Sequence, residues 1–223
     1  NGFIPWDDDI DIMMPREDYC KLATLMRNLT HDRFLYLDYE SCDGYFYPFA
    51  KVVDKRTRII EKDCKLIEKL GVYIDVFPID EVSDDYEENE KLFRKYKLYD
   101  FMLASYKMKK PTKNNVFKLI IKYILKLYMN LFSNYKKIIK KIELLGKKYK
   151  NTNTVACISG RYFDKEIMPS SYIDTYKLQK FENYEFKIPV GYDEYLTKHY
   201  GNYMKLPPKE KQISNHSTEV YWR

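Results

Sequence analysis

The sequence predicts an α+β fold in which a mixed sheet is flanked by helices and interrupted by a helical insertion. Short runs of β-branched and aromatic residues, bounded by Pro or Gly, indicate the strands. Apolar residues spaced three and four apart indicate helices before and after them. The chain of 223 residues predicts one domain, 1–223, in which residues 84–150 form a helical and basic insertion.

A local pattern predicts each element in turn. Pro15 should end a short strand that follows a loop beginning at residue 3, and an amphipathic helix should then run to Leu29. The buried side of that helix is predicted to hold Tyr19, Leu22, Leu25, Met26 and Leu29. The later predicted elements are strands at 45–53, 58–60 and 72–77 (the last closed by Pro78), helices at 81–109 and 116–132, and short strands and turns over 151–223 with a helix at 192–200.

The charges are unevenly distributed along the chain. The net charge is +6, with the basic excess in residues 105–150 and acidic clusters at 7–11 and 80–90. This pattern favours a local basic surface and argues against a nucleic-acid-binding protein. The four scattered cysteines, and the lack of a signal peptide or a long apolar run, predict a cytoplasmic protein, with the inner face of the plasma membrane as the alternative.

Three carboxylates carry the predicted chemistry. Asp9 and Asp11 alternate with Ile10 and Ile12, so on a strand both acids should project to one face while the isoleucines turn into the core. Asp75 stands between apolar residues of a later strand, where an acid is costly unless it is paired or binds a metal. Oxygen ligands on a rigid edge suit Mg²⁺ or Mn²⁺.

Together, an Asp-x-Asp pair and a later strand-borne acid are typical of a nucleotidyltransferase-like fold. Each acid alone would be no more than a loop cap or a surface charge. Asp7 and Asp8 stay open: each is either a part of the site or only a loop residue or a neighbour of the metal ligands.

Several segments, in order along the whole chain, point to one family. The most specific is GFIPWDDDIDI at 2–12, continued by MPREDY at 14–19. The others are Lys51 within FAKVVD with Thr57 after it, YIDVFPID at 73–80, FENYEFKIP at 181–189, GYDEYL at 191–196, YGNYM at 200–204 and LPP at 206–208. In these segments the chain resembles the LicD family of phosphotransferases, whose relatives include fukutin and fukutin-related protein. Family members resemble one another in a glycine-containing segment just upstream, so the native protein is expected to extend beyond Asn1.

The resemblance implies that a sugar hydroxyl of a glycan or lipid-linked glycan attacks the distal phosphate of CDP-choline or a related CDP-alcohol, and that CMP leaves. Asp9 and Asp11 would hold Mg²⁺ or Mn²⁺, and Asp75 would be either the general base or a further metal ligand. Lys51 would neutralise a phosphate oxygen, unless it is a solvent lysine at a strand edge. Further donor contacts are expected from Arg16, Arg161 and His216. For Arg16, a surface ion pair is the alternative.

Two further features each keep two interpretations. A choline group needs an aromatic cage, for which Trp6, Tyr45, Tyr47 and Tyr73 are available, although each could equally pack in the core. The helix at 116–132 is apolar except for Asn130 and for one stripe of lysines, which is made of Lys118, Lys122 and Lys126. It is either a core helix whose lysines face water or, with the lysine-rich continuation to residue 150, a peripheral contact with anionic lipid.

Three other functions stay open. A nucleotidyltransferase would transfer a nucleoside monophosphate and release pyrophosphate, so the released product distinguishes it. A glycosyltransferase with its own Asp-x-Asp would need a nucleotide-binding unit before residue 7. A non-catalytic glycan-binding protein would have no need of three strand-borne acids.

Overall fold

The computed structural model of the chain describes residues 2–7, 9–109, 116–131, 134–214 and 218–223, and it has the predicted α+β composition. The strands are β1 (Asp11–Pro15), β2 (Phe34–Leu37), β3 (Ala50–Asp54), β4 (Thr57–Glu61), β5 (Tyr73–Val82), β6 (Thr154–Ala156), β7 (Ile167–Pro169), β8 (Tyr176–Phe181), β9 (Tyr184–Pro189) and β10 (Thr218–Trp222). The helices are α1 (Arg16–Asn28), α2 (Tyr86–Lys107), α3 (Val116–Leu131), α4 (Tyr135–Gly146), α5 (Phe163–Glu166), α6 (Ser171–Asp174), α7 (Tyr192–Tyr200) and a 3-10 turn at Lys209–Lys211. Helices α2 to α4 lie within the predicted insertion, whose bounds of 84–150 stay a prediction.

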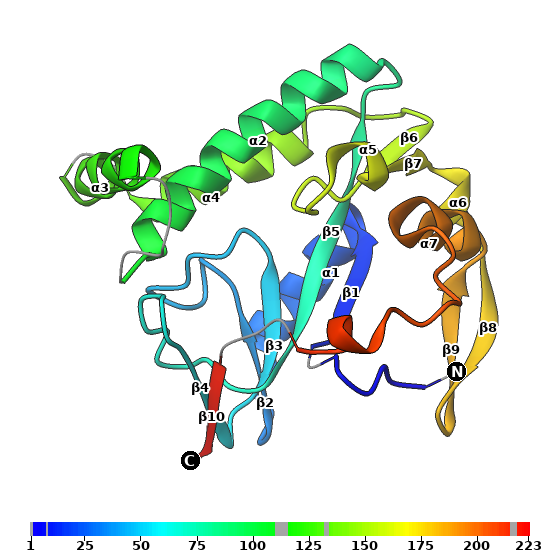
Figure 1. Cartoon of the computed structure of the whole chain (residues 1–223), viewed down its shortest axis with the longest axis horizontal. Helices are drawn as coiled ribbons and strands as arrows, with labels where there is room; N and C mark the ends of the chain where they lie inside the picture. Colours follow the sequence, from blue (N-terminus) through cyan, green and yellow to red (C-terminus); the bar gives the residue numbers. More distant parts are fainter. Residues whose placement is uncertain (1, 8, 110–115, 132–133, 215–217) are drawn as a thin grey trace.

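The central sheet is mixed, as predicted. Its strands follow the order β2-β3-β5-β6-β7 with antiparallel pairings, and β1 joins β5 as a parallel neighbour. β8 and β9 form a separate hairpin, and β10 returns from the end of the chain to pair with β4. Figure 1 shows β5 running through the middle of the molecule, with α2 and α4 running obliquely toward its upper part from the left and α3 at the far left.

The two faces of the sheet contribute to different cores. Ala50 of β3 and Val76 of β5 pack against α1, whereas Val53 belongs to the larger core that α2 and α4 complete. Successive residues of a strand point to opposite faces. Lys51 is next to Ala50 on β3, and Asp75 is next to Val76 on β5. Both Lys51 and Asp75 therefore project from the face opposite α1.

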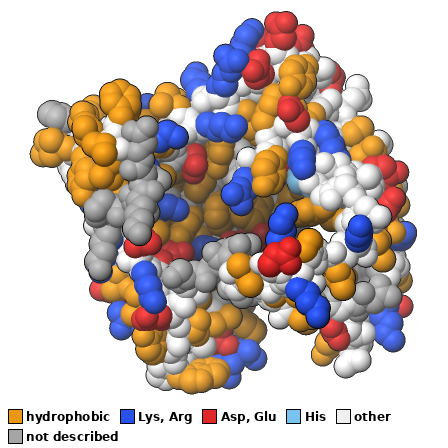
Figure 2. Space-filling model, viewed as in Figure 1, with side chains coloured by type: hydrophobic (Ala, Val, Ile, Leu, Met, Phe, Trp, Pro, Cys, Tyr) orange, Lys and Arg blue, Asp and Glu red, His pale blue; other side chains and the backbone are white. Residues whose placement is uncertain are grey.

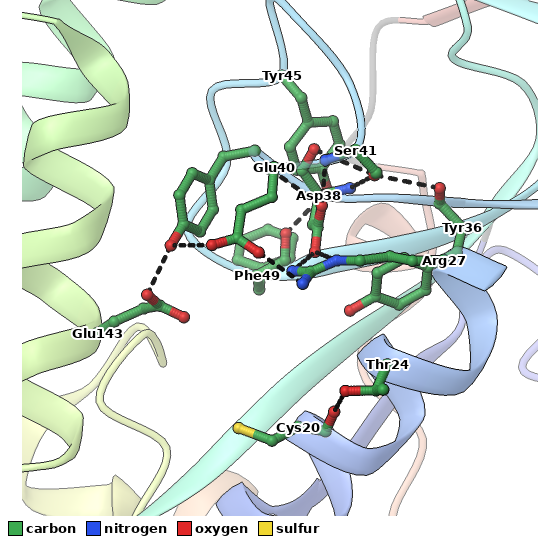
Figure 3. A network of polar contacts seen from close by, with 11 residues as sticks. Cys20, Thr24, Arg27, Tyr36, Asp38, Glu40, Ser41, Tyr45, Phe49 and Glu143 are labelled. Atoms are coloured by element: carbon green, nitrogen blue, oxygen red, sulfur yellow. Dashed lines mark hydrogen bonds and ion pairs between the residues drawn. The ribbon is translucent and has the colours of Figure 1, made fainter.

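A polar network holds α1 and α4 against the loop that follows β2, as Figure 3 shows. Arg27 of α1 pairs with Asp38, which is 4% exposed. Tyr39 donates a hydrogen bond of 2.6 Å to Glu143 of α4. These contacts order the start of the loop at residues 38–49, which carries the aromatic side chains of the site described below.

β5 does not end at Pro78, and that part of the prediction was wrong. Among the described strands, β1 alone pairs with residues 77–79 of β5, because β3 pairs with 73–76 and β6 with 80–82. Pro78 has no N–H to donate, but its nitrogen can face the side of β5 that has no strand neighbour at this point. No hydrogen bond between strands is then lost. The strand continues to Val82, and the helix predicted from Glu81 begins only at Tyr86.

Some predicted core residues are exposed. Ile10 and Ile12 are each 40% exposed, because β1 has β5 as its one described strand neighbour and so lies at a sheet edge. Leu25 of α1 and Leu29, which follows the helix, are also exposed, because neither belongs to the core that Tyr19 forms with the sheet. The strand predicted from residue 45 begins only at Ala50, since residues 45–49 form the loop.

α3 packs against α2 with its lysine side turned inward. Lys126 Nζ donates to the carbonyl oxygen of Met108 at 2.7 Å, and Met129 is buried. The interpretation of α3 as a core helix whose three lysines face water therefore does not hold for Lys126. None of the described helices combines the length and apolar character needed to cross a membrane.

Candidate active site

One row of side chains crosses the sheet. The strand register pairs Asp11 of β1 with Asp75 of β5, and Asp75 with Lys51 of β3. Register partners project from the same face of a sheet, so these three side chains lie side by side. Strand pairing thus brings together three of the residues that the sequence singled out.

Lys51 and Asp75 form a buried ion pair. Lys51 Nζ lies 2.5 Å from Asp75 Oδ1, and the two residues are 2% and 8% exposed. Burial lowers the pKa of Lys51 and raises the pKa of Asp75, while each partner opposes the shift of the other. Asp9 raises the pKa of Asp75 further. Lys51 is therefore not the solvent lysine that the sequence also allowed, and Asp75 is a stronger proton acceptor than an exposed aspartate.

An aromatic cage surrounds the ammonium of Lys51. Its Nζ lies 3.4 Å from the ring centroid of Tyr73, 4.8 Å from that of Tyr47 and 5.4 Å from that of Phe49. Tyr45 is fully buried and donates to the carbonyl oxygen of Phe49 at 2.9 Å. Two of the predicted walls of a choline cage thus hold a cation that belongs to the protein, and Tyr45 packs in the core.

Four acids act on the pKa of one phenol. Burial raises the pKa of Tyr73, and Asp75, Glu61, Asp9 and Asp11 raise it further. Asp11 is exposed and Asp9 is half-buried, whereas Asp75 is buried. The two acids predicted to hold a metal therefore lie at the open edge of the site, and Asp75 lies in its floor.

The last third of the chain reaches the same edge. Tyr195 of α7 donates to Met13 Sδ of β1 at 3.7 Å. Burial raises the pKa of Tyr200, and Glu166 and Asp11 contribute to the same shift. The late segment at 191–196 therefore contacts the strand that carries Asp11.

Arg16 belongs to a different ion pair. Its Nε and Nη2 donate to the two carboxylate oxygens of Asp80 at 2.6 and 2.7 Å, and Asp80 is fully buried. Asp80 lies five residues beyond Asp75 on β5, which is about 16 Å along the strand and on the other face. The structure thus does not bring Arg16 to the acids, and the ion pair that it does form is buried rather than on the surface. His216, like Asp8, lies outside the described residues.

A pocket of about 510 Å³ opens beside the Lys51–Asp75 pair. Its walls are the loop at residues 46–49, one side of α2, and the turn at 159–161 that follows β6. Tyr47 and Phe49 line the pocket and also contact the Lys51 ammonium, so the pocket and the ion pair share a wall. In Figure 2 the middle of this side of the molecule is hollowed, with apolar side chains inside and Lys and Arg side chains around it.

The charged lining of this pocket is mainly basic. Lys97, Lys107 and Arg161 line it together with one acid, Asp100. The Lys107 ammonium lies 5.1 Å from the ring centroid of Tyr47, so this ring already faces two cations. A pocket with three basic groups and aromatic walls suits an anionic ligand with a flat ring. Arg161, which the sequence singled out for donor binding, therefore lies in this pocket and not among the acids.

Two charged residues of the site were missed by sequence reasoning. Tyr47 donates to both carboxylate oxygens of Glu61, at 2.8 and 2.7 Å, and Glu61 acts on the pKa of Lys51 and of Asp75. The alternation that buries Ile59 of β4 puts Glu61 on the same face, and this period of two was the available signal. Lys107 had no comparable signal, because it is one lysine among many on a charged helix.

The donor atoms of the site fit a hard divalent ion. Within the described part of the chain, no three His, Cys, Asp or Glu side chains stand together as a ready-made metal site. Mg²⁺ does not require one, since it keeps several waters and commonly binds through one or two carboxylates plus substrate phosphates. Asp9 and Asp11 supply such carboxylates at the open edge, while Asp75 already holds an ammonium.

Fold and site together define an α+β domain whose open sheet edge presents acids beside a buried Lys–Asp pair. The family described as "LicD/FKTN/FKRP, nucleotidyltransferase domain" matches residues 1–117, which include Asp9, Asp11, Lys51 and Asp75. The chain is also 31% identical to the lipopolysaccharide cholinephosphotransferase LicD of Haemophilus influenzae over 230 aligned residues, which cover 99% of this chain and 82% of that protein. The chain therefore belongs to the LicD family. No solved structure matches it.

Proposed function

We propose that this protein transfers phosphocholine, or a related alcohol phosphate, from a CDP-linked donor to a sugar hydroxyl of a cell-surface glycan, and releases CMP. The observation that carries the proposal is the row of Asp11, Asp75 and Lys51 on one face of the sheet. The family membership supports a nucleotidyltransferase-like fold. The similar protein from H. influenzae, whose name joins choline phosphate transfer to lipopolysaccharide, supports the transferred group and a glycan acceptor.

Asp9 and Asp11 are the residues that would hold Mg²⁺ or Mn²⁺ at the open edge. A bound divalent ion would neutralise the charge of the donor diphosphate. Asp75 is proposed as the general base, which accepts the proton of the sugar hydroxyl as that oxygen forms its bond to the distal phosphorus and CMP departs. Its alternative role as a metal ligand is less compatible with the ammonium that it holds at 2.5 Å.

Lys51 has a positioning role in this proposal. Its ammonium is fixed by Asp75 and by the three aromatic rings, so its charge lies at a constant place beside the reacting groups. A fixed charge in a buried site interacts more strongly with a phosphate than a mobile surface lysine does. It also keeps Asp75 ionised, because the Lys51 charge opposes the effect of burial on the Asp75 pKa.

The basic pocket is proposed to take the nucleotide part of the donor. Its aromatic wall can stack on a pyrimidine base, and Lys107 and Arg161 can contact the phosphates. The rings of Tyr47 and Phe49 line the pocket on one side and contact the Lys51 ammonium on the other. A donor bound in the pocket would therefore direct its distal phosphate toward Asp75.

A nucleotidyltransferase reaction is the second candidate, since the description of the matching family includes a nucleotidyltransferase domain. The two reactions differ in what leaves: CMP for phosphocholine transfer, and pyrophosphate for nucleotidyl transfer. Incubation with CDP-choline, CTP and a glycan acceptor, followed by chromatography of the nucleotides, separates them. CMP released from CDP-choline supports the first reaction, and pyrophosphate released from CTP without CMP supports the second.

A further inference from the structure

α3 turns an apolar stripe toward the outside of the molecule. Val116, Ile120, Ile124, Leu127 and Leu131 are each more than half exposed. Their spacing of three or four residues places them on one side of the helix, in a stripe about 22 Å long at 1.5 Å per residue. In Figure 2, apolar side chains gather at the left, where Figure 1 places α3.

The stripe is not what holds α3 in the fold. The helix contacts the rest of the chain through its opposite side, where Met129 is buried and Lys126 donates to the carbonyl oxygen of Met108. Lys122 is half-buried on that side as well. An amphipathic helix that faced only water would be turned the other way, so the exposed stripe indicates a surface made for contact.

The chain around the stripe carries charge of one sign. Residues 101–142 contain eleven Lys and no Asp or Glu. On α4, Lys137, Lys140 and Lys141 are exposed. This combination of an apolar stripe and a lysine-rich segment without acidic side chains complements a surface that is apolar inside and anionic outside.

We propose that α3 docks this protein on an anionic lipid surface. The stripe would lie at the boundary between headgroups and acyl chains, and the lysines would contact lipid phosphates. A second copy of the chain fits this surface less well, because it would bring two lysine-rich segments without acidic side chains toward each other. The proposal goes beyond the transfer reaction, and it concerns residues that take no part in that reaction.

Vesicle flotation of the 223-residue chain tests the proposal. We expect the protein to float with phosphatidylcholine vesicles that contain phosphatidylglycerol and to stay in the dense fraction with pure phosphatidylcholine. The double substitution Ile124→Asp, Leu127→Asp should lower the bound fraction at least tenfold. The matched control is Leu25→Asp, Leu29→Asp at the C-terminal end of α1, which changes two leucines that are also more than half exposed and should keep binding within about twofold. Thermal melts of both variants show that each is folded.

Three results would overturn the proposal: no flotation of the unchanged protein, equal flotation of the α3 variant and the control, or a dimer that the α3 variant converts to a monomer. Transfer to a soluble acceptor should be the same in the unchanged protein and the α3 variant. A failure of the proposed reaction would therefore leave the flotation result intact, and the two proposals fail separately.

Discussion

Replacing Lys51 with Met should cost this protein about 3–5 kcal/mol of unfolding free energy at pH 7, the usual loss when one partner of a buried ion pair is removed. Met keeps the apolar stem of the side chain, so the lost interactions are the 2.5 Å contact with Asp75 and the cation–π contacts with the rings of Tyr47 and Tyr73. The carboxylate of Asp75 is then buried without its ammonium.

The dependence of this loss on pH follows from the Asp75 pKa. Burial already raises that pKa in the folded protein, and removal of Lys51 takes away the opposing effect. A group whose folded pKa exceeds its unfolded pKa binds its proton more tightly in the folded state, so the variant should recover stability as the pH falls from 8 to 5. Urea unfolding at each pH measures this directly.

A double-mutant cycle supplies the control. Asp75→Asn removes the other partner, and Lys51→Met with Asp75→Asn replaces a charged pair by a neutral one, which is often nearly neutral for stability. The double variant should therefore lie within about 2 kcal/mol of the unchanged protein. The reasoning would be refuted if the losses of unfolding free energy in the two single variants added up in the double variant. A loss below about 1 kcal/mol in Lys51→Met, or one that does not change with pH, would refute it as well.

Three further predictions follow from the site and its surroundings. Arg161→Ala should raise KM for CDP-choline several-fold and leave the urea midpoint unchanged, because Arg161 is exposed at the pocket; an unchanged KM would exclude it from donor binding. Arg16→Ala should lower the unfolding free energy by about 3–5 kcal/mol, since it leaves Asp80 buried without its partner; equal urea midpoints would contradict this. The acid limb of kcat/KM should lie above the ordinary range of an aspartate, because ionised Asp75 is required and burial raises its pKa. An acid limb in the ordinary range would exclude Asp75 as the base.

The strand-borne part of the site could be predicted from sequence because its signals are local. Asp75 interrupts an apolar strand, and Asp11 begins the strand that pairs with it. Asp9 precedes that strand, so the shared face of Asp9 and Asp11 stays a prediction. The mixed sheet and helix α7 follow from similarly local patterns and were predicted correctly. The register that aligns Asp11, Asp75 and Lys51 was not predictable in this way, since it depends on which strands become neighbours.

The failures have the same origin. Pro78 was expected to close a strand, and it does not because β3 and β6 leave one edge of β5 open there. Arg16 was assigned to the donor by its position beside the motif, although its partner Asp80 is far away in sequence. For α3, the sequence pattern predicted an apolar side and a lysine side. It did not predict which side faces the rest of the protein, because that depends on the contact with α2.

The most direct test of the proposed reaction is nucleotide release from CDP-choline by the protein with Mg²⁺ or Mn²⁺ and a crude cell-wall glycan, compared with Asp9→Ala and Asp11→Ala. We expect metal-dependent release of CMP, with phosphocholine recovered on the glycan, and loss of both in each variant. A folded protein that binds the metal but releases no CMP from CDP-choline, CDP-ribitol or CDP-glycerol would contradict the proposed transfer and favour the nucleotidyltransferase reaction.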